Sequence, residues 1–129
     1  MIERQKKFSI GDKTFIVNFP NVGQLIDLES LKQALTNNRD GVMAASGVAS
    51  MYYVLDIVDA VAFFQVCVPA VAKYYNVKNY TSLSPENVKD FVDAYQNQIK
   101  PWFDKTMLEL KGVESHGENE IENGIDSKE

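Results

Sequence analysis

The chain has 129 residues, 45% of them hydrophobic, and a formal net charge of −5 at pH 7. This length supports one domain with its own core, and the lack of a long Lys and Arg cluster argues against a nucleic-acid-binding protein. The single cysteine, Cys67, excludes an intramolecular disulfide, and the polar first residues do not resemble a secretory signal, so we expect an intracellular protein.

Residues 6–19 predict a β-hairpin around the turn pair Gly11-Asp12. Apolar residues alternate with polar ones on both sides of that turn: Phe8, Ile10, Phe15, Val17 and Phe19. Two strands alone are only marginally stable in water. The hairpin must therefore pack on helices or join the sheet of another chain.

A helix is predicted to follow Pro20, with Asn21 as its cap, and to continue to Thr36. Its apolar residues recur at helical spacing: Val22, Leu25, Ile26, Leu28, Leu31 and Leu35. The polar run 36–41 then predicts a turn. Because this turn is short, we expect the next helix to return antiparallel to the first.

Residues 42–71 are the most apolar part of the chain, and only Asp56 and Asp59 carry charge there. We expect one helix of about 25 residues that starts after Gly41 and is disturbed near Pro69. Small residues in its first two turns, including Gly47, would let another backbone approach closely, either within the chain or from a second subunit. A helix that is apolar nearly all round is buried by neighbours, by another subunit or by lipid. The two central Asp residues and the lack of basic flanks argue against a membrane span.

The last third of the chain predicts an aromatic connection and then another helix. Tyr74, Tyr75 and Tyr80 either cover the core with their hydroxyls outward or form a stacking surface for a ligand. Ser84-Pro85 is a helix start, and Pro101 must kink or restart the helix that follows.

Together these elements predict an α+β, mainly α fold: an N-terminal β-hairpin followed by a bundle of three to four helices. We expect residues 1–111 to form a single domain and residues 112–129 to form a disordered acidic tail. The only histidine, His116, lies in this tail, where we expect it to be solvated.

Asp56 and Asp59 are the one pair of side chains that could do chemistry together, since residues three apart share a helix face. They could form a solvated or salt-bridged stripe, contact a partner, or act in acid–base catalysis. The sequence has no phosphate-binding glycine loop and no nucleophile-elbow pattern, and one histidine cannot build a zinc site or a His-based triad with its neighbours. We therefore expect no catalytic residue, no cofactor and no bound metal.

The hairpin with its Gly11-Asp12-Lys13 turn leads into the segment FPNVGQLIDLE at residues 19–29, then into apolar helices and an acidic tail. This order, and the segment 14–29 in particular, resembles small assembly and virion-associated proteins of tailed bacteriophages. The nearest class is the tail assembly chaperones. The resemblance implies a mostly helical protein without cofactors, which holds the hydrophobic tape-measure protein soluble while the tail tube forms around it.

The expected function is therefore that of a non-enzymatic interaction protein in the host cytoplasm or the virion, which binds a protein client or forms a homo-oligomer. The residues expected to contact the partner are Tyr52, Asp56, Asp59, Phe63, Phe64, Trp102 and Phe103. Three alternatives stay open: a permanent oligomeric virion or structural component, a small membrane-associated helical protein, and a ligand-binding module built on the tyrosine cluster.

Overall fold

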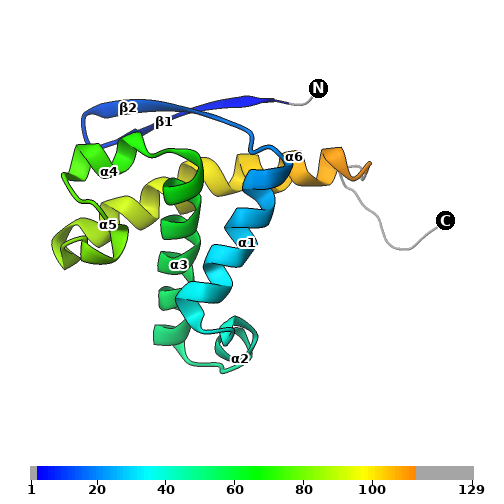
Figure 1. The fold of residues 1–129 in the computed structure, drawn as a ribbon, viewed down its shortest axis with the longest axis vertical. Helices are drawn as coiled ribbons and strands as arrows, with labels where there is room; N and C mark the ends of the chain where they lie inside the picture. The colour runs from blue at the N-terminus through cyan, green and yellow to red at the C-terminus, as the bar shows by residue number, and fades with distance from the viewer. Residues whose placement is uncertain (1–2, 113–129) are drawn as a thin grey trace.

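The computed structural model describes residues 3–112, which form a two-stranded hairpin packed on a set of helices (Figure 1). This arrangement confirms the predicted mainly helical α+β class with an N-terminal hairpin. The expected disordered tail, residues 112–129, lies outside the described residues apart from Gly112.

The hairpin consists of β1 (Gln5–Ile10) and β2 (Lys13–Asn18), which pair antiparallel with Phe8 opposite Phe15. Gly11 has a φ of +60°, which suits the first position of a two-residue hairpin turn. One face of the hairpin is buried on the helices and carries four of the residues predicted by the alternation: Phe8, Ile10, Phe15 and Val17. The other face is exposed to solvent.

Helix α1 (Val22–Thr36) starts where the cap predicts. The Asn21 side chain accepts a hydrogen bond from the Gln24 N–H, and the Gln24 side chain accepts one from the Asn21 N–H. The helix ends at Asn37, which is in the left-handed conformation with φ 53°. Of the predicted apolar stripe, Leu28 is buried, whereas Val22 and Ile26 point into solvent.

The predicted single central helix is wrong: two helices stand in its place, α2 (Asp40–Ala44) and α3 (Ala49–Cys67). The break lies at Ser46-Gly47. The Ser46 hydroxyl donates to the Met43 carbonyl and accepts from the Val48 N–H, which replaces helical bonds, and Gly47 has a φ of +72°. A Cβ on Gly47 would meet no atom of the described chain within 4 Å, so this glycine serves the turn and not a close approach to another part of the chain.

Helix α3 runs antiparallel beside α1, as expected from the short connection (Figure 1). It ends at Val68, before Pro69, and α4 (Ala70–Tyr75) and the single turn η1 (Tyr80–Ser82) follow. These short elements connect α3 to the next helix, which contacts β1 of the hairpin.

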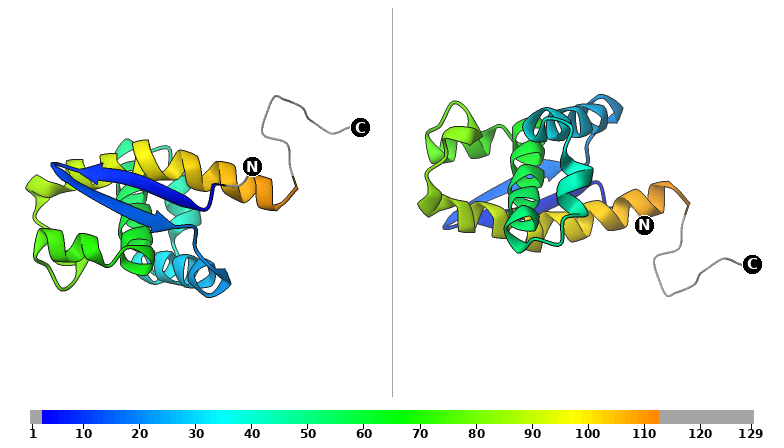
Figure 2. Two further views of the ribbon diagram at one scale, coloured as in Figure 1. Left: turned by 90° about the horizontal axis from the view of Figure 1, so that it is seen from above. Right: turned by 90° about the horizontal axis from the view of Figure 1, so that it is seen from below.

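The last helices form one long rod beneath the hairpin: α5 (Pro85–Ala94), η2 (Tyr95–Ile99) and α6 (Lys100–Leu110) (Figures 1 and 2). Helix α5 starts at the predicted Ser84 cap. Segment η2 is a π-helical turn that ends two residues before Pro101. An α-helical proline would clash with the carbonyl four residues earlier, and the wider π turn lets the rod continue past it.

The core lies where the hairpin, the second half of α3 and the rod meet. Phe64 is fully buried at its centre, with ring centroids 5.7 Å from Phe8 and 4.9 Å from Phe91. Phe63, next to it on α3, packs against Tyr95 at 5.4 Å. These two adjacent rings on α3 therefore join the hairpin to the rod.

Candidate interaction surface

The two halves of α3 have opposite surroundings. Val58 and residues 60–64 are buried, whereas residues 49–54 are all exposed. Six large apolar side chains, which we call the apolar tip, are exposed on α2, the following loop and this first part of α3: Val42, Val48, Met51, Tyr52, Tyr53 and Val54. Their exposed fractions run from 41% for Met51 to 67% for Val42.

The apolar tip is exposed because of the way the helices are arranged. Helices α1 and α3 project away from the hairpin and from the α5–α6 rod, and the first turns of α3 lie at the far end of this projection with α2 beside them (Figure 1). No residue of α2 is buried. Apolar patches larger than about a few hundred Å² are rare on monomeric proteins and mark interaction sites, so this concentration of exposed apolar side chains makes the tip the strongest candidate for a functional surface.

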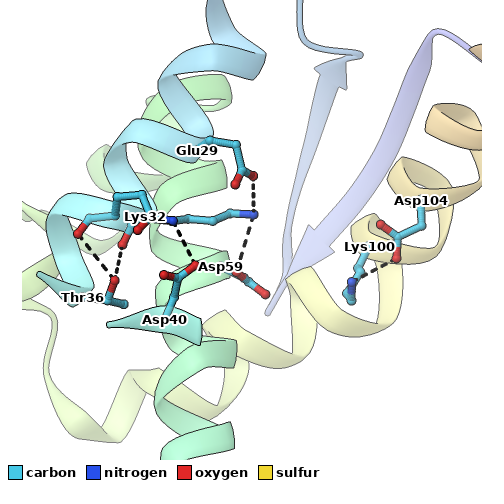
Figure 3. A network of polar contacts seen from close by, with 8 residues as sticks. Glu29, Lys32, Thr36, Asp40, Asp59, Lys100 and Asp104 are labelled. Atoms are coloured by element: carbon cyan, nitrogen blue, oxygen red, sulfur yellow. Dashed lines mark hydrogen bonds and ion pairs between the residues drawn. The ribbon is translucent and has the colours of Figure 1, made fainter. Parts of the chain in front are cut away.

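A small network of charges crosses from α1 to α3 above the tip (Figure 3). The Lys32 ammonium lies 3.2 Å from the Glu29 carboxylate and 3.7 Å from the Asp59 carboxylate. Burial raises the pKa of Asp59 above its ordinary value, while the positive charge of Lys32 opposes this shift. The network therefore joins the two helices at a modest electrostatic cost, since the Asp59 charge is only partly compensated.

The expected partner residues fall into two groups. Tyr52 is exposed on the tip, and Asp56 and Asp59 are half-buried one and two turns farther along α3. Residues at these spacings lie on one helix face. The structure therefore brings these three together on one accessible face of α3.

The expected aromatic anchors form the second group, and they belong to the core. Phe63 is 2% exposed, Phe64 is 0% and Trp102 is 5%. Phe103 is partly buried against the same core. Phe63, Phe64 and Trp102 hold the core together, so the substitutions Phe63→Asp and Trp102→Ala would impair folding before they could report on binding.

Trp102 has a specific structural task. Its indole N–H donates to the Glu3 carbonyl at 2.7 Å, and its ring packs edge-on against Phe19 at 5.7 Å. Trp102 thereby holds the start of the chain and the end of the hairpin against α6.

Sequence reasoning missed most of the apolar tip. It named Tyr52 but not Val42, Val48, Met51, Tyr53 or Val54, because it treated the stretch as one continuous helix and left open what covers it. The available signal was the Ser46-Gly47 pair, which separates a short apolar helix from the long one.

The tyrosine cluster differs from the expectation that its hydroxyls point outward. The Tyr80 hydroxyl is buried and donates to the Val68 carbonyl, and the Tyr75 hydroxyl is buried without a hydrogen-bond partner among residues 3–112. Their hydroxyls therefore do not face solvent as predicted. Tyr74 is 39% exposed and packs edge-on against Phe15 at 6.0 Å, which places it against the hairpin as a covering side chain.

Comparisons with known proteins found no match. No protein-family model, curated protein or solved structure matches this chain. The likeness to phage assembly proteins therefore rests on the sequence segments quoted above.

Two further features bear on the class of site. Among residues 3–112, no group of three or more His, Cys, Asp or Glu side chains is placed to hold a metal ion. Within the same range, α3 is the one helix that is long and apolar enough to cross a membrane by length and composition. The second half of α3 lies in the core of the fold.

Proposed function

We propose that this protein is a non-enzymatic interaction protein that binds an apolar helical segment of a client protein through the apolar tip. It would act as a tail assembly chaperone of a tailed bacteriophage. The observation that supports this proposal is the concentration of exposed apolar side chains on α2 and the first turns of α3.

The physical basis is the burial of apolar surface. An amphipathic helix laid beside α3 would cover Met51, Tyr52 and neighbouring side chains, and each square ångström removed from water contributes about 25 cal/mol. Tyr and Met suit such a surface, because Tyr offers a large rigid contact area and Met adapts to different partners. In return, the client's own apolar face is shielded from water until it reaches its final assembly.

A second candidate function is that of a permanent oligomeric component. The exposed first turns of α3 favour it as well, since two copies of the same apolar helix face can pack on each other about a two-fold axis. In this case the tip is a subunit interface and is covered at all times.

A membrane-associated role fits less well. Insertion of α3 into a bilayer would remove Val58 and Phe64 from the core and leave the hairpin without its main support. The charge of Asp56, near the middle of the helix, would also have to enter lipid.

The test uses a synthetic apolar helical peptide that precipitates from water when alone. We expect the wild-type protein to hold it soluble at a roughly equimolar ratio, as measured by turbidity. The double substitution Met51→Lys and Tyr52→Lys should abolish this effect, because it places two charges on the face of α3 that would contact the peptide. The matched control is Val22→Lys with Ile26→Lys on α1, since those side chains are also exposed and apolar, at 72% and 61%, but lie outside the tip.

Two results would contradict the chaperone function. One is a peptide that precipitates regardless of the wild-type protein. The other is an equal loss of activity in the tip variant and the α1 control, which would mean that any added charge has the same effect. A molar mass that stays oligomeric over about a hundredfold dilution by light scattering, and falls to that of a monomer in the tip variant, would support the permanent oligomer instead.

A further inference from the structure

A cavity of about 180 Å³ lies at the corner where α1 and α3 meet η2 and α6. Its walls include the buried Leu28 and Phe63 and the partly buried Phe103. Glu29, Lys32 and Asp59 also line it, and their greater exposure places them at the mouth. The cavity is therefore apolar inside and charged at its rim.

The size and chemistry of this cavity suit one large apolar side chain. Protein interiors are close-packed, and their voids are seldom larger than a water molecule. Apolar walls offer water few hydrogen bonds, so the interior of this cavity favours a hydrocarbon group over water.

One face of α3 leads from the cavity to the apolar tip. Phe63, Asp59, Asp56 and Tyr52 follow each other at spacings of three and four residues, so they lie on one face of the helix. Asp59 is paired with Lys32 at 3.7 Å. Asp56 makes no ion pair with any residue of the described part of the chain. An uncompensated negative charge thus stands between an apolar cavity and an apolar surface.

We propose that this face of α3 binds a client helix of defined pattern: a large apolar residue that enters the cavity, a Lys or Arg three or four residues away that pairs with Asp56, and a second large apolar residue three or four residues farther on that packs on the tip. This inference rests on the proposed function and names the class of client. The basic residue fixes the register of the helix, because only one position along the face offers an unpaired carboxylate.

A second copy of this chain does not carry the pattern. In the described helices, no Lys or Arg has exposed large apolar residues three or four positions away on both sides. Lys32 and Lys105 come nearest, but Leu28 beside the first and Trp102 beside the second are buried. The occupant is therefore a different protein with a basic apolar helix.

The experiment compares two labelled peptides of about 20 residues, long enough to form helices. Both carry Leu-x-x-x-B-x-x-Leu in an Ala- and Gln-rich helix, where B is Lys in one peptide and Glu in the other. Binding to the full-length protein is measured by fluorescence anisotropy at low ionic strength. We expect the Lys peptide to bind about tenfold tighter than the Glu peptide, because the charge on Asp56 attracts one and repels the other.

The substitution Asp56→Asn should remove this preference and leave the fold unchanged by circular dichroism. The matched control is Asp93→Asn on α5, whose carboxylate pairs with Lys89 on the protein surface, and this variant should keep the preference.

Equal binding of both peptides to the wild-type protein would overturn the inference. If this equal binding is lost in the tip variant, the proposed function still holds. Binding of neither peptide would overturn both. A stable dimer that weakens on Asp56→Asn would also overturn it, since the occupant would then be a second copy.

Discussion

The side-chain amide of Gln98 binds both backbone groups of Ser9. Its Oε1 accepts from the Ser9 N–H at 2.8 Å, and its Nε2 donates to the Ser9 carbonyl at 2.8 Å. These two groups point away from β2, on the outer edge of the hairpin. An open strand edge invites pairing with other chains, so Gln98 both satisfies this edge and fastens the hairpin to the helical rod.

Gln98→Ala removes both of these bonds. Each bond contributes about 0.5–1.5 kcal/mol, so the free energy of unfolding should fall by about 1–3 kcal/mol in urea titrations. Gln65→Ala is the control, because Gln65 is exposed on α3 and makes no hydrogen bond through its side chain to any residue between 3 and 112. If both variants lose the same stability, the two hydrogen bonds between Gln98 and Ser9 contribute nothing to it.

Gly11→Ala tests the close approach of the hairpin turn to α4. Gly11 has a φ of +60°, and an added Cβ would lie 2.8 Å from the Tyr74 hydroxyl oxygen. Backbone strain and displacement of Tyr74 should together lower stability by about 1–3 kcal/mol in thermal unfolding. Gly41→Ala serves as the control, because a Cβ there meets nothing within 4 Å and Gly41 is helical, so this variant should be neutral or slightly more stable. Equal effects at both positions would refute this explanation.

The raised pKa of Asp59 gives its contribution to stability a defined dependence on pH. Burial, the largest cause, favours the protonated form in the folded state, so the stabilising contribution is complete below the unfolded pKa and is lost as pH rises through the folded pKa. Asp59→Asn should therefore raise the melting temperature at about pH 7, and this gain should shrink toward about pH 4. Asp104→Asn, which breaks an exposed pair with Lys100 at 2.9 Å, should change stability by no more than about 0.5 kcal/mol. A lower melting temperature of the Asp59→Asn variant at neutral pH would mean that the ion pair with Lys32 outweighs the cost of burial.

Cys67 should be unreactive in the folded protein. Burial raises the pKa of its thiol to about 12, whereas an exposed thiol has a pKa of about 8.5. Alkylation by iodoacetamide at about pH 8.5, followed by mass spectrometry, should be at least about tenfold slower in the native protein than in urea. Above the unfolded pKa the unfolded state gains thiolate first, so this residue also makes the fold less stable as pH rises toward 12. Similar rates in both conditions would show that the thiol is open to solvent.

Local signals in the sequence predicted most of the elements. The Gly11-Asp12 turn, the Asn21 cap and the Ser84-Pro85 start all depend on neighbours a few residues away, and the structure places each where it was expected. The break at Ser46-Gly47 was missed, because the apolar runs on both sides of these two small residues predict one continuous helix. The error carried over to the site, since a single continuous helix gave no reason to separate an exposed first part of α3 from a buried second part.

The sequence by itself determined the hairpin, the helix caps and the apolar character of residues 42–71, because these follow from turn chemistry and side-chain spacing along the chain. Only the tertiary structure decided which apolar residues of that stretch are covered. Phe63 and Phe64 are buried because the hairpin and the α5–α6 rod meet over them. Met51 and Tyr53 are exposed because the first turns of α3 lie at the far end of the α1–α3 projection, away from the hairpin. Burial is set by contacts between distant parts of the chain, and hydrophobicity alone does not distinguish a core residue from an anchor for a partner.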